Sequence, residues 1–230
     1  HTRDRRQRQM CIRDSAELKQ EVLRYKDHPA LLLWGIGNEL DLKYTNTRVW
    51  DAVEELAKFI HEADPNHPTS TVLAGIDPAK IHMVRTRCPN IDVLGVNAYG
   101  SIEKLPLNIR RYGWNKPYIV TEWGVNGFWE RPSTSWSRPI EETSLEKRAN
   151  FEARYAMMNG WDGFMGNFAF LWGFKQERTP TWFSISVEDD SSAGRPDFLN
   201  GEFTSIADVL EAEWRLSLIH ISEPTRPLTI

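Results

Sequence analysis

One apolar run, Leu31–Glu39, constrains the fold of this chain more than any other stretch. It reads LLLWGIGNE and ends in an amide and a carboxylate, Asn38 and Glu39. A continuous apolar run of this kind is typical of a strand buried on both faces, whose C-terminal tip carries polar groups into a cleft. Parallel α/β sheets place their chemistry at that edge. The run therefore predicts an α/β fold with functional side chains at the tip of this strand.

A second run repeats the pattern. The residues Tyr118–Thr121 are followed by Glu122 and Trp123, so two predicted strands each carry a glutamate at the same end. Two carboxylates on strand tips suit glycoside hydrolysis, in which one protonates the leaving oxygen while the other attacks the anomeric carbon or activates a water. An Asn-Glu pair after one apolar strand also fits a capping or ion-pair role. The matching context of the second glutamate favours the catalytic interpretation for the pair.

The chain also contains the aromatic residues that a sugar site needs. Trp34, Trp123 and Trp172 offer apolar ring faces for a pyranose, and Asn38 offers a donor for a sugar hydroxyl. Ten tryptophans with a net charge of −4 favour a carbohydrate partner over nucleic acid.

Two segments resemble a known group of enzymes. WGIGNE and IVTEWG are similar to the acid/base and nucleophile strands of the clan A retaining glycoside hydrolases. These are (β/α)8 barrels with the two glutamates at the ends of the fourth and seventh strands. Within the clan, HPALLLWGIGNEL most resembles the TIM-barrel catalytic domain of glycoside hydrolase family 2, which holds β-galactosidases, β-glucuronidases and β-mannosidases.

The resemblance implies a role for each matching residue. Glu39 would be the general acid/base and Glu122 the nucleophile that forms a glycosyl-enzyme, with their carboxyl groups about 5 to 5.5 Å apart. Asn38 would bond the sugar 2-hydroxyl. Tyr99 is similar in position to a tyrosine that hydrogen-bonds the nucleophile, and Trp172 to a tryptophan beneath the −1 sugar. Without the resemblance, both are ordinary strand-end or core aromatic residues.

Hydrophobic periodicity sets out an alternating order of elements. Strands are expected near 31 and 118 and over 69–74, 91–97 and 162–173. Helices are expected over 16–27, 49–60, 78–87, 103–112, 143–158 and 204–214, and Thr143 and Glu146 form a capping box at the start of the helix over 143–158. If the first strand is the fourth of a barrel, the chain is the C-terminal portion, about five of eight strands, of a (β/α)8 TIM barrel. We expect such a fragment to have open edges and an incomplete pocket, and to be unstable or prone to associate.

The ends of the chain have a different composition. Residues 1–14 and 217–230 resemble translated sequencing-adapter read-through, which leaves 15–216 as the partial catalytic barrel. The alternative is a basic arm and a flexible tail.

Several classes of partner are not expected. No run approaches the ~18 residues of a membrane span. The six histidines and two cysteines lack metal-ligand spacing, so no metal or cofactor is predicted. The oligomeric state is open, and a periplasmic or secreted location is compatible with the sequence.

The long segment 126–142 holds Trp129 and Trp136 without periodicity. Loops of this length are typically functional lids or pocket walls, and the alternative is a surface excursion. The leading hypothesis is an exo-acting retaining β-glycosidase. An endo-glycanase or β-1,3-glucanosyltransferase of the same clan, or a non-catalytic carbohydrate-binding barrel, stays open as an alternative.

Overall fold

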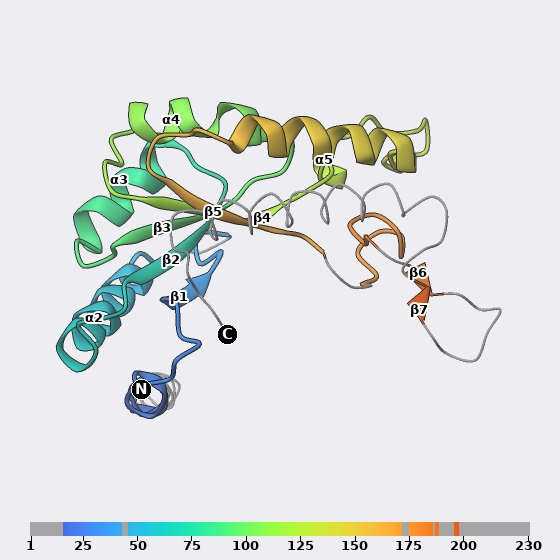
Figure 1. Ribbon diagram of the computed structural model, residues 1–230. Helices are drawn as coiled ribbons and strands as arrows, with labels where there is room; N and C mark the ends of the chain where they lie inside the picture. The colour runs from blue at the N-terminus through green and yellow to red at the C-terminus, as the bar shows by residue number, and fades with distance from the viewer. Residues whose placement is uncertain (1–15, 43–45, 172–174, 186, 189–195, 198–230) are drawn as a thin grey trace, which may run out of the picture. The chain divides into compact units, whose positions relative to one another are not determined.

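A computed structural model describes residues 16–42, 46–171, 175–185, 187–188 and 196–197 (Figure 1). The chain divides into two compact units. The first unit comprises His1–Thr121 and Asp162–Asn167, and the second comprises Glu122–Trp161 and Phe168–Ile230.

Five strands form one sheet in sequence order: β1 Trp34–Asn38, β2 Thr69–Ala74, β3 Val93–Asn97, β4 Tyr118–Trp123 and β5 Phe164–Ala169. The strands are parallel, with Trp34 opposite Thr69 in the first pair and Ser70 opposite Val93 in the second. Short β6 Val187–Glu188 and β7 Pro196–Asp197 pair antiparallel. The α/β fold with about five parallel barrel strands, predicted from the sequence, is confirmed.

Helices alternate with these strands: α2 Arg48–Ala63, α3 Pro78–Arg87, η1 Gly100–Lys104, α4 Leu105–Arg111, η2 Phe128–Glu130 and α5 Ser144–Met158. Residues 16–25 are also helical. Helix α3 starts where the Asp77 side chain accepts the Lys80 N–H, and α5 starts at the predicted capping box of Thr143 and Glu146. The helix expected over 204–214 lies outside the described residues.

The core of the first unit lies around β2 and β3. Leu73, Leu94 and Val96 are fully buried, as are Trp50 and Ala57 on α2. Helix α2 packs on β1, β2 and α3. Strands β2 and β3 each have a neighbour on both sides, which accounts for their burial along nearly their whole length.

Strand β1 differs from its prediction. The expectation of a strand buried on both faces is wrong, because Ile36 is the one buried residue of β1 and the preceding Leu32 is 66% exposed. The physical reason is that β1 lies at the edge of the sheet with β2 as its neighbour. The pairing with β2 is also irregular between Gly35 and Asn38.

In the described part of the chain, none of the helices has the length and apolarity to cross a bilayer. Within the same residues, no three His, Cys, Asp or Glu side chains gather as a metal site would require.

Candidate active site

Glu39 leaves the end of β1 through a sharp turn. Its φ is 52° and that of Gly37 is 77°, so the backbone is left-handed at both residues. This conformation costs a non-glycine residue about 1–2 kcal/mol. The Glu39 N–H donates to the Val72 carbonyl at 3.0 Å, which fixes the turn on β2. Residues held in such sparsely populated backbone regions cluster at functional sites.

Asn97, the last residue of β3, holds the Glu39 side chain. Its Nδ2 donates to Glu39 Oε1 at 2.9 Å and lies 3.3 Å from Asn38 Oδ1. Its Oδ1 accepts from the Thr121 hydroxyl of β4 at 2.7 Å, which fixes the orientation of the amide. Asn97 is 4% exposed, so these bonds are shielded from water. One Glu39 oxygen thus accepts an amide N–H.

Asn97 was missing from the residues predicted for the site. The sequence does contain a signal for it, because Asn97 ends the strand expected over 91–97 as Asn38 ends the earlier apolar run. The strands of a parallel sheet end at one edge, so a polar residue that ends a strand lies at the edge where the site is expected.

The chain after Glu39 is fixed by a buried ion pair. Asp41 is 7% exposed, and its Oδ1 accepts the Ala74 N–H at 3.0 Å. Lys80 Nζ lies 2.6 Å from the other carboxylate oxygen and also donates to the Ala74 carbonyl at 2.6 Å. The start of the loop after β1 is thereby attached to the end of β2.

Two further predicted aromatic residues belong to the first unit. Tyr99 follows β3, is 7% exposed and precedes η1; its hydrogen bond to Glu122 stays a prediction. Trp34 begins β1, and its indole N–H donates to Asp64 at 2.8 Å. Trp34 therefore lies at the opposite end of β1 from Glu39.

Glu122 belongs to β4 and is half-buried. The charge of Lys175 is close to it. The hydrogen bond and charge of Glu177, 2.5 Å from Lys175 Nζ, raise the pKa of Lys175, and the charge of Glu122 raises it further. Lys175 therefore lies within electrostatic range of the Glu122 carboxylate.

The residues after Glu122 are closely packed. The Trp123 carbonyl accepts the Phe170 N–H at 2.7 Å. A Cβ on Gly124 would lie 2.8 Å from the Phe170 carbonyl oxygen, so a side chain does not fit there. The Trp123 ring is fully buried and packs on Phe151, with ring centroids 5.0 Å apart. The ring joins β4 to α5, and substrate contact by Trp123 stays a prediction. Trp172 lies outside the described residues.

Arg154 of α5 is hydrogen-bonded to the same segment. It is 3% exposed and donates to the Gly124 carbonyl and to Asn126 Oδ1, each at 2.5 Å. Asn126 donates to the buried Glu142 carboxylate, also at 2.5 Å. Glu142 accepts further bonds from Arg131 and Asn150. Both ends of the segment 126–142 are therefore attached to α5, while Trp129 and Trp136 between them are exposed.

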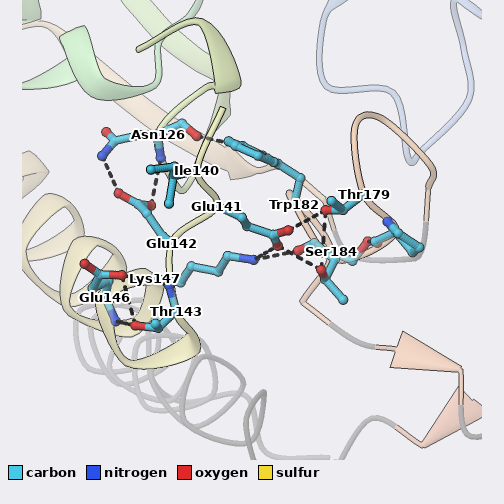
Figure 2. Close-up of polar contacts among 12 residues, drawn as sticks. Asn126, Ile140, Glu141, Glu142, Thr143, Glu146, Lys147, Thr179, Trp182 and Ser184 are labelled. Atoms are coloured by element: carbon cyan, nitrogen blue, oxygen red, sulfur yellow. Dashed lines mark hydrogen bonds and ion pairs between the residues drawn. The ribbon is translucent and has the colours of Figure 1, made fainter. Parts of the chain in front are cut away.

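A second buried network lies beside it, and Figure 2 shows how its side chains converge. Lys147 of α5 is 3% exposed, and its Nζ lies 2.6 Å from Glu141 and 2.7 Å from the Thr181 carbonyl. Glu141 also accepts from the Thr179 and Thr181 hydroxyls. Burial alone would raise the pKa of Glu141, but the bonds from Lys147 and the two threonines outweigh it and lower that pKa.

The structure thus joins Glu39, Asn38 and Asn97 by hydrogen bonds at the end of the sheet in the first unit. In the second unit, Lys175 lies within electrostatic range of Glu122. The separation of the two glutamates stays a prediction.

Known proteins resemble the chain in sequence and in fold. The family model described as glycosyl hydrolases family 2, TIM barrel domain, matches residues 2–138, which include both glutamates. The match begins inside the segment 1–14, whose predicted artefactual origin is untested. No curated protein matches the chain.

Three solved β-glucuronidases have a similar fold. The one from Dictyoglomus thermophilum has a TM-score of 0.54 and 17% identity over 73% of this chain and 31% of its own. One from an uncultured Clostridium sp. has a TM-score of 0.54 and 20% identity over 86% of this chain and 36% of its own. The one from Ruminococcus gnavus has a TM-score of 0.55 and 13% identity over 86% of this chain and 34% of its own. The chain spans about a third of the length of these proteins. Because the family model matches more than half of its residues, the chain belongs to glycosyl hydrolase family 2, as a part of the TIM-barrel domain.

Proposed function

We propose that this barrel domain hydrolyses the O-glycosidic bond of a β-glycoside by a retaining double displacement. The observation that carries the proposal is the position of the two glutamates, Glu39 directly after β1 and Glu122 within the last residues of β4, in a family 2 barrel domain. Carboxyl groups that project from strand ends of a barrel are suited to act on one bound sugar.

In the first step the Glu122 carboxylate attacks the anomeric carbon. The bond from that carbon to the leaving oxygen breaks, and the protonated Glu39 gives its proton to that oxygen. In the second step Glu39, now a carboxylate, takes a proton from water. The water oxygen bonds to the anomeric carbon, the ester bond to Glu122 breaks, and Glu122 returns to its carboxylate form.

Neighbouring groups support these roles. Asn97 holds one oxygen of Glu39 through its amide, which leaves the other for proton exchange. Lys175, whose pKa is raised by Glu177 and further by the charge of Glu122, supplies a positive charge near the proposed nucleophile. Asn38 is the last residue of β1, directly before Glu39, and would bond the sugar 2-hydroxyl.

We propose that the enzyme is exo-acting and of the β-galactosidase, β-glucuronidase or β-mannosidase type. β-Glucuronides come first in a substrate panel because the similar solved structures are β-glucuronidases. A panel of 4-nitrophenyl β-glycosides and β-linked oligosaccharides separates exo-action from endo-action or transfer to a second sugar.

The test uses Glu122→Gln and Glu39→Gln, with Glu152→Gln as the control because Glu152 is an exposed residue of α5. The first two variants should lose turnover by several orders of magnitude and the control should retain it. A 2-fluoro glycoside should add mass at Glu122 of the wild type. Full turnover in Glu122→Gln would refute the mechanism. A wild type that binds sugar without turnover, and keeps its affinity in Glu122→Gln, would identify a carbohydrate-binding barrel.

A further inference from the structure

Trp129 is a tryptophan that the proposed mechanism does not use. It lies in η2, seven residues after Glu122 in the sequence and within the same unit, and it is 60% exposed. Exposing so much of an indole to water is unfavourable, since an apolar surface is most stable when covered.

The Trp129 ring packs against the backbone at Gly127. A Cβ on Gly127 would lie 2.4 Å from two atoms of the six-membered ring and 2.7 Å from a third. The six-membered ring therefore packs directly against Gly127, where any side chain would displace it. The Gly127 N–H is in turn bonded to the Glu130 carboxylate at 2.8 Å, which closes the short turn beneath the ring.

Further aromatic residues fix the orientation of the ring. Phe128 meets it edge-on, with centroids 4.8 Å apart, and Phe183 lies at 6.3 Å. Phe183 is 4% exposed, and the adjacent Trp182 is 2% exposed and donates to the Asn126 carbonyl at 3.0 Å. The base of this cluster is thus buried and hydrogen-bonded, while Trp129 at its top faces water.

Two charged residues lie near this cluster. Glu130 is the exposed neighbour of Trp129, and the exposed Arg178 guanidinium lies 4.3 Å from the centroid of the Phe128 ring. A pyranose has an apolar face of C–H groups bordered by hydroxyls, and a fixed aromatic ring with charged neighbours matches both parts. A protein interface buries about 800 Å² per partner, far more than one ring supplies.

We propose that Trp129 is a stacking platform for a pyranose ring of the carbohydrate substrate. This inference rests on the proposed function and adds a binding residue to it. Trp136, on the same segment and 71% exposed, serves as the matched control, because it lies on the hairpin closed by Ser133 and Pro139.

The test measures binding without turnover, in the Glu122→Gln background of the full chain. The probes are methyl β-D-glucuronide, methyl β-D-galactoside and methyl β-D-mannoside. Calorimetry measures the Kd of each probe. Adding Trp129→Ala should raise the Kd of the bound probe about 5- to 10-fold, as expected for the loss of an aromatic contact. Trp129→Phe should recover part of the lost affinity, and Trp136→Ala should leave the Kd within about twofold of the parent's value.

Gly127→Ala gives an independent test that keeps the tryptophan. Its φ of −64° and ψ of 148° suit alanine, so the fold is retained while the ring is displaced. This variant should also weaken binding. Equal affinity in Trp129→Ala and its parent would overturn the platform and leave the enzyme intact. Failure of every probe to bind the parent, with no turnover in the wild type, would overturn the proposed function together with the platform.

Discussion

Lys147→Met should be one of the most destabilising substitutions in the second unit. Lys147 is an almost fully buried ammonium, with the Glu141 carboxylate 2.6 Å away and the Thr181 carbonyl at 2.7 Å (Figure 2). Methionine retains the length and apolar stem of the side chain. The substitution therefore removes the charge and the two hydrogen bonds with little change of volume.

The magnitude follows from the geometry. Opposite charges 2.6 Å apart attract by about 6 kcal/mol at an effective dielectric of ~20, and desolvation of both groups offsets part of that energy. Breaking a buried pair costs about 3–5 kcal/mol, because the remaining charge lacks its partner. Glu141 is 21% exposed and keeps two threonine hydroxyls, so we expect the lower end, about 3 kcal/mol.

Urea unfolding of Lys147→Met, Glu141→Gln and the double variant measures the free energy of unfolding and the coupling between the two residues. The exposed pair Arg148 and Glu152 on the same helix, 2.8 Å apart with each side chain 47% exposed, is the matched control. Its coupling should stay below about 0.5 kcal/mol. If the Lys147 cycle gives no more coupling than this control, the network is not a source of stability.

Three further outcomes are expected. The pKa of Glu141 is lower in the folded chain than in the unfolded chain. Glu141 therefore stabilises the fold at any pH above its unfolded-state pKa, and this stabilisation is lost as the pH falls through its folded-state pKa. Glu141→Gln should therefore flatten the decline in the free energy of unfolding that is measured below about pH 4. Asn97→Ala should lower kcat about 10-fold or more with a smaller change in KM, because Glu39 loses its amide donor, and steady-state kinetics checks this. Burial raises the pKa of Cys88 to about 12, so alkylation of the Cys88 thiol at pH 8 should be negligible until denaturant is added. Mass spectrometry of the peptide that contains Cys88 checks this.

Local signals in the sequence were strongest where residues mark the ends of elements. The strand Thr69–Ala74 and the helix Pro78–Arg87 occur with the predicted bounds, because a proline at the first helical position and a preceding aspartate define the start of α3. The capping box at Thr143 likewise located the start of α5. These features depend on residues a few positions apart.

Features that depend on distant partners were not predictable in this way. The burial of Lys147 requires Glu141 and a loop residue, Thr181, to surround it, and no local pattern indicates this. The contact of Asn97 with Glu39 joins residues on two strands that are not neighbours in the sheet. The exposure of β1 was also missed, because hydrophobicity does not tell an edge strand from a central one.

The irregular backbone of β1 has a consequence for self-association. An edge strand with a regular row of N–H and C=O groups is a template on which another chain can add a strand and start an aggregate. In β1 the left-handed Gly37 and the interrupted register between Gly35 and Asn38 break that row. Bends of this kind make an edge a poor template for growth. The turn that directs Glu39 away from the strand therefore also limits fibril-like extension from this edge.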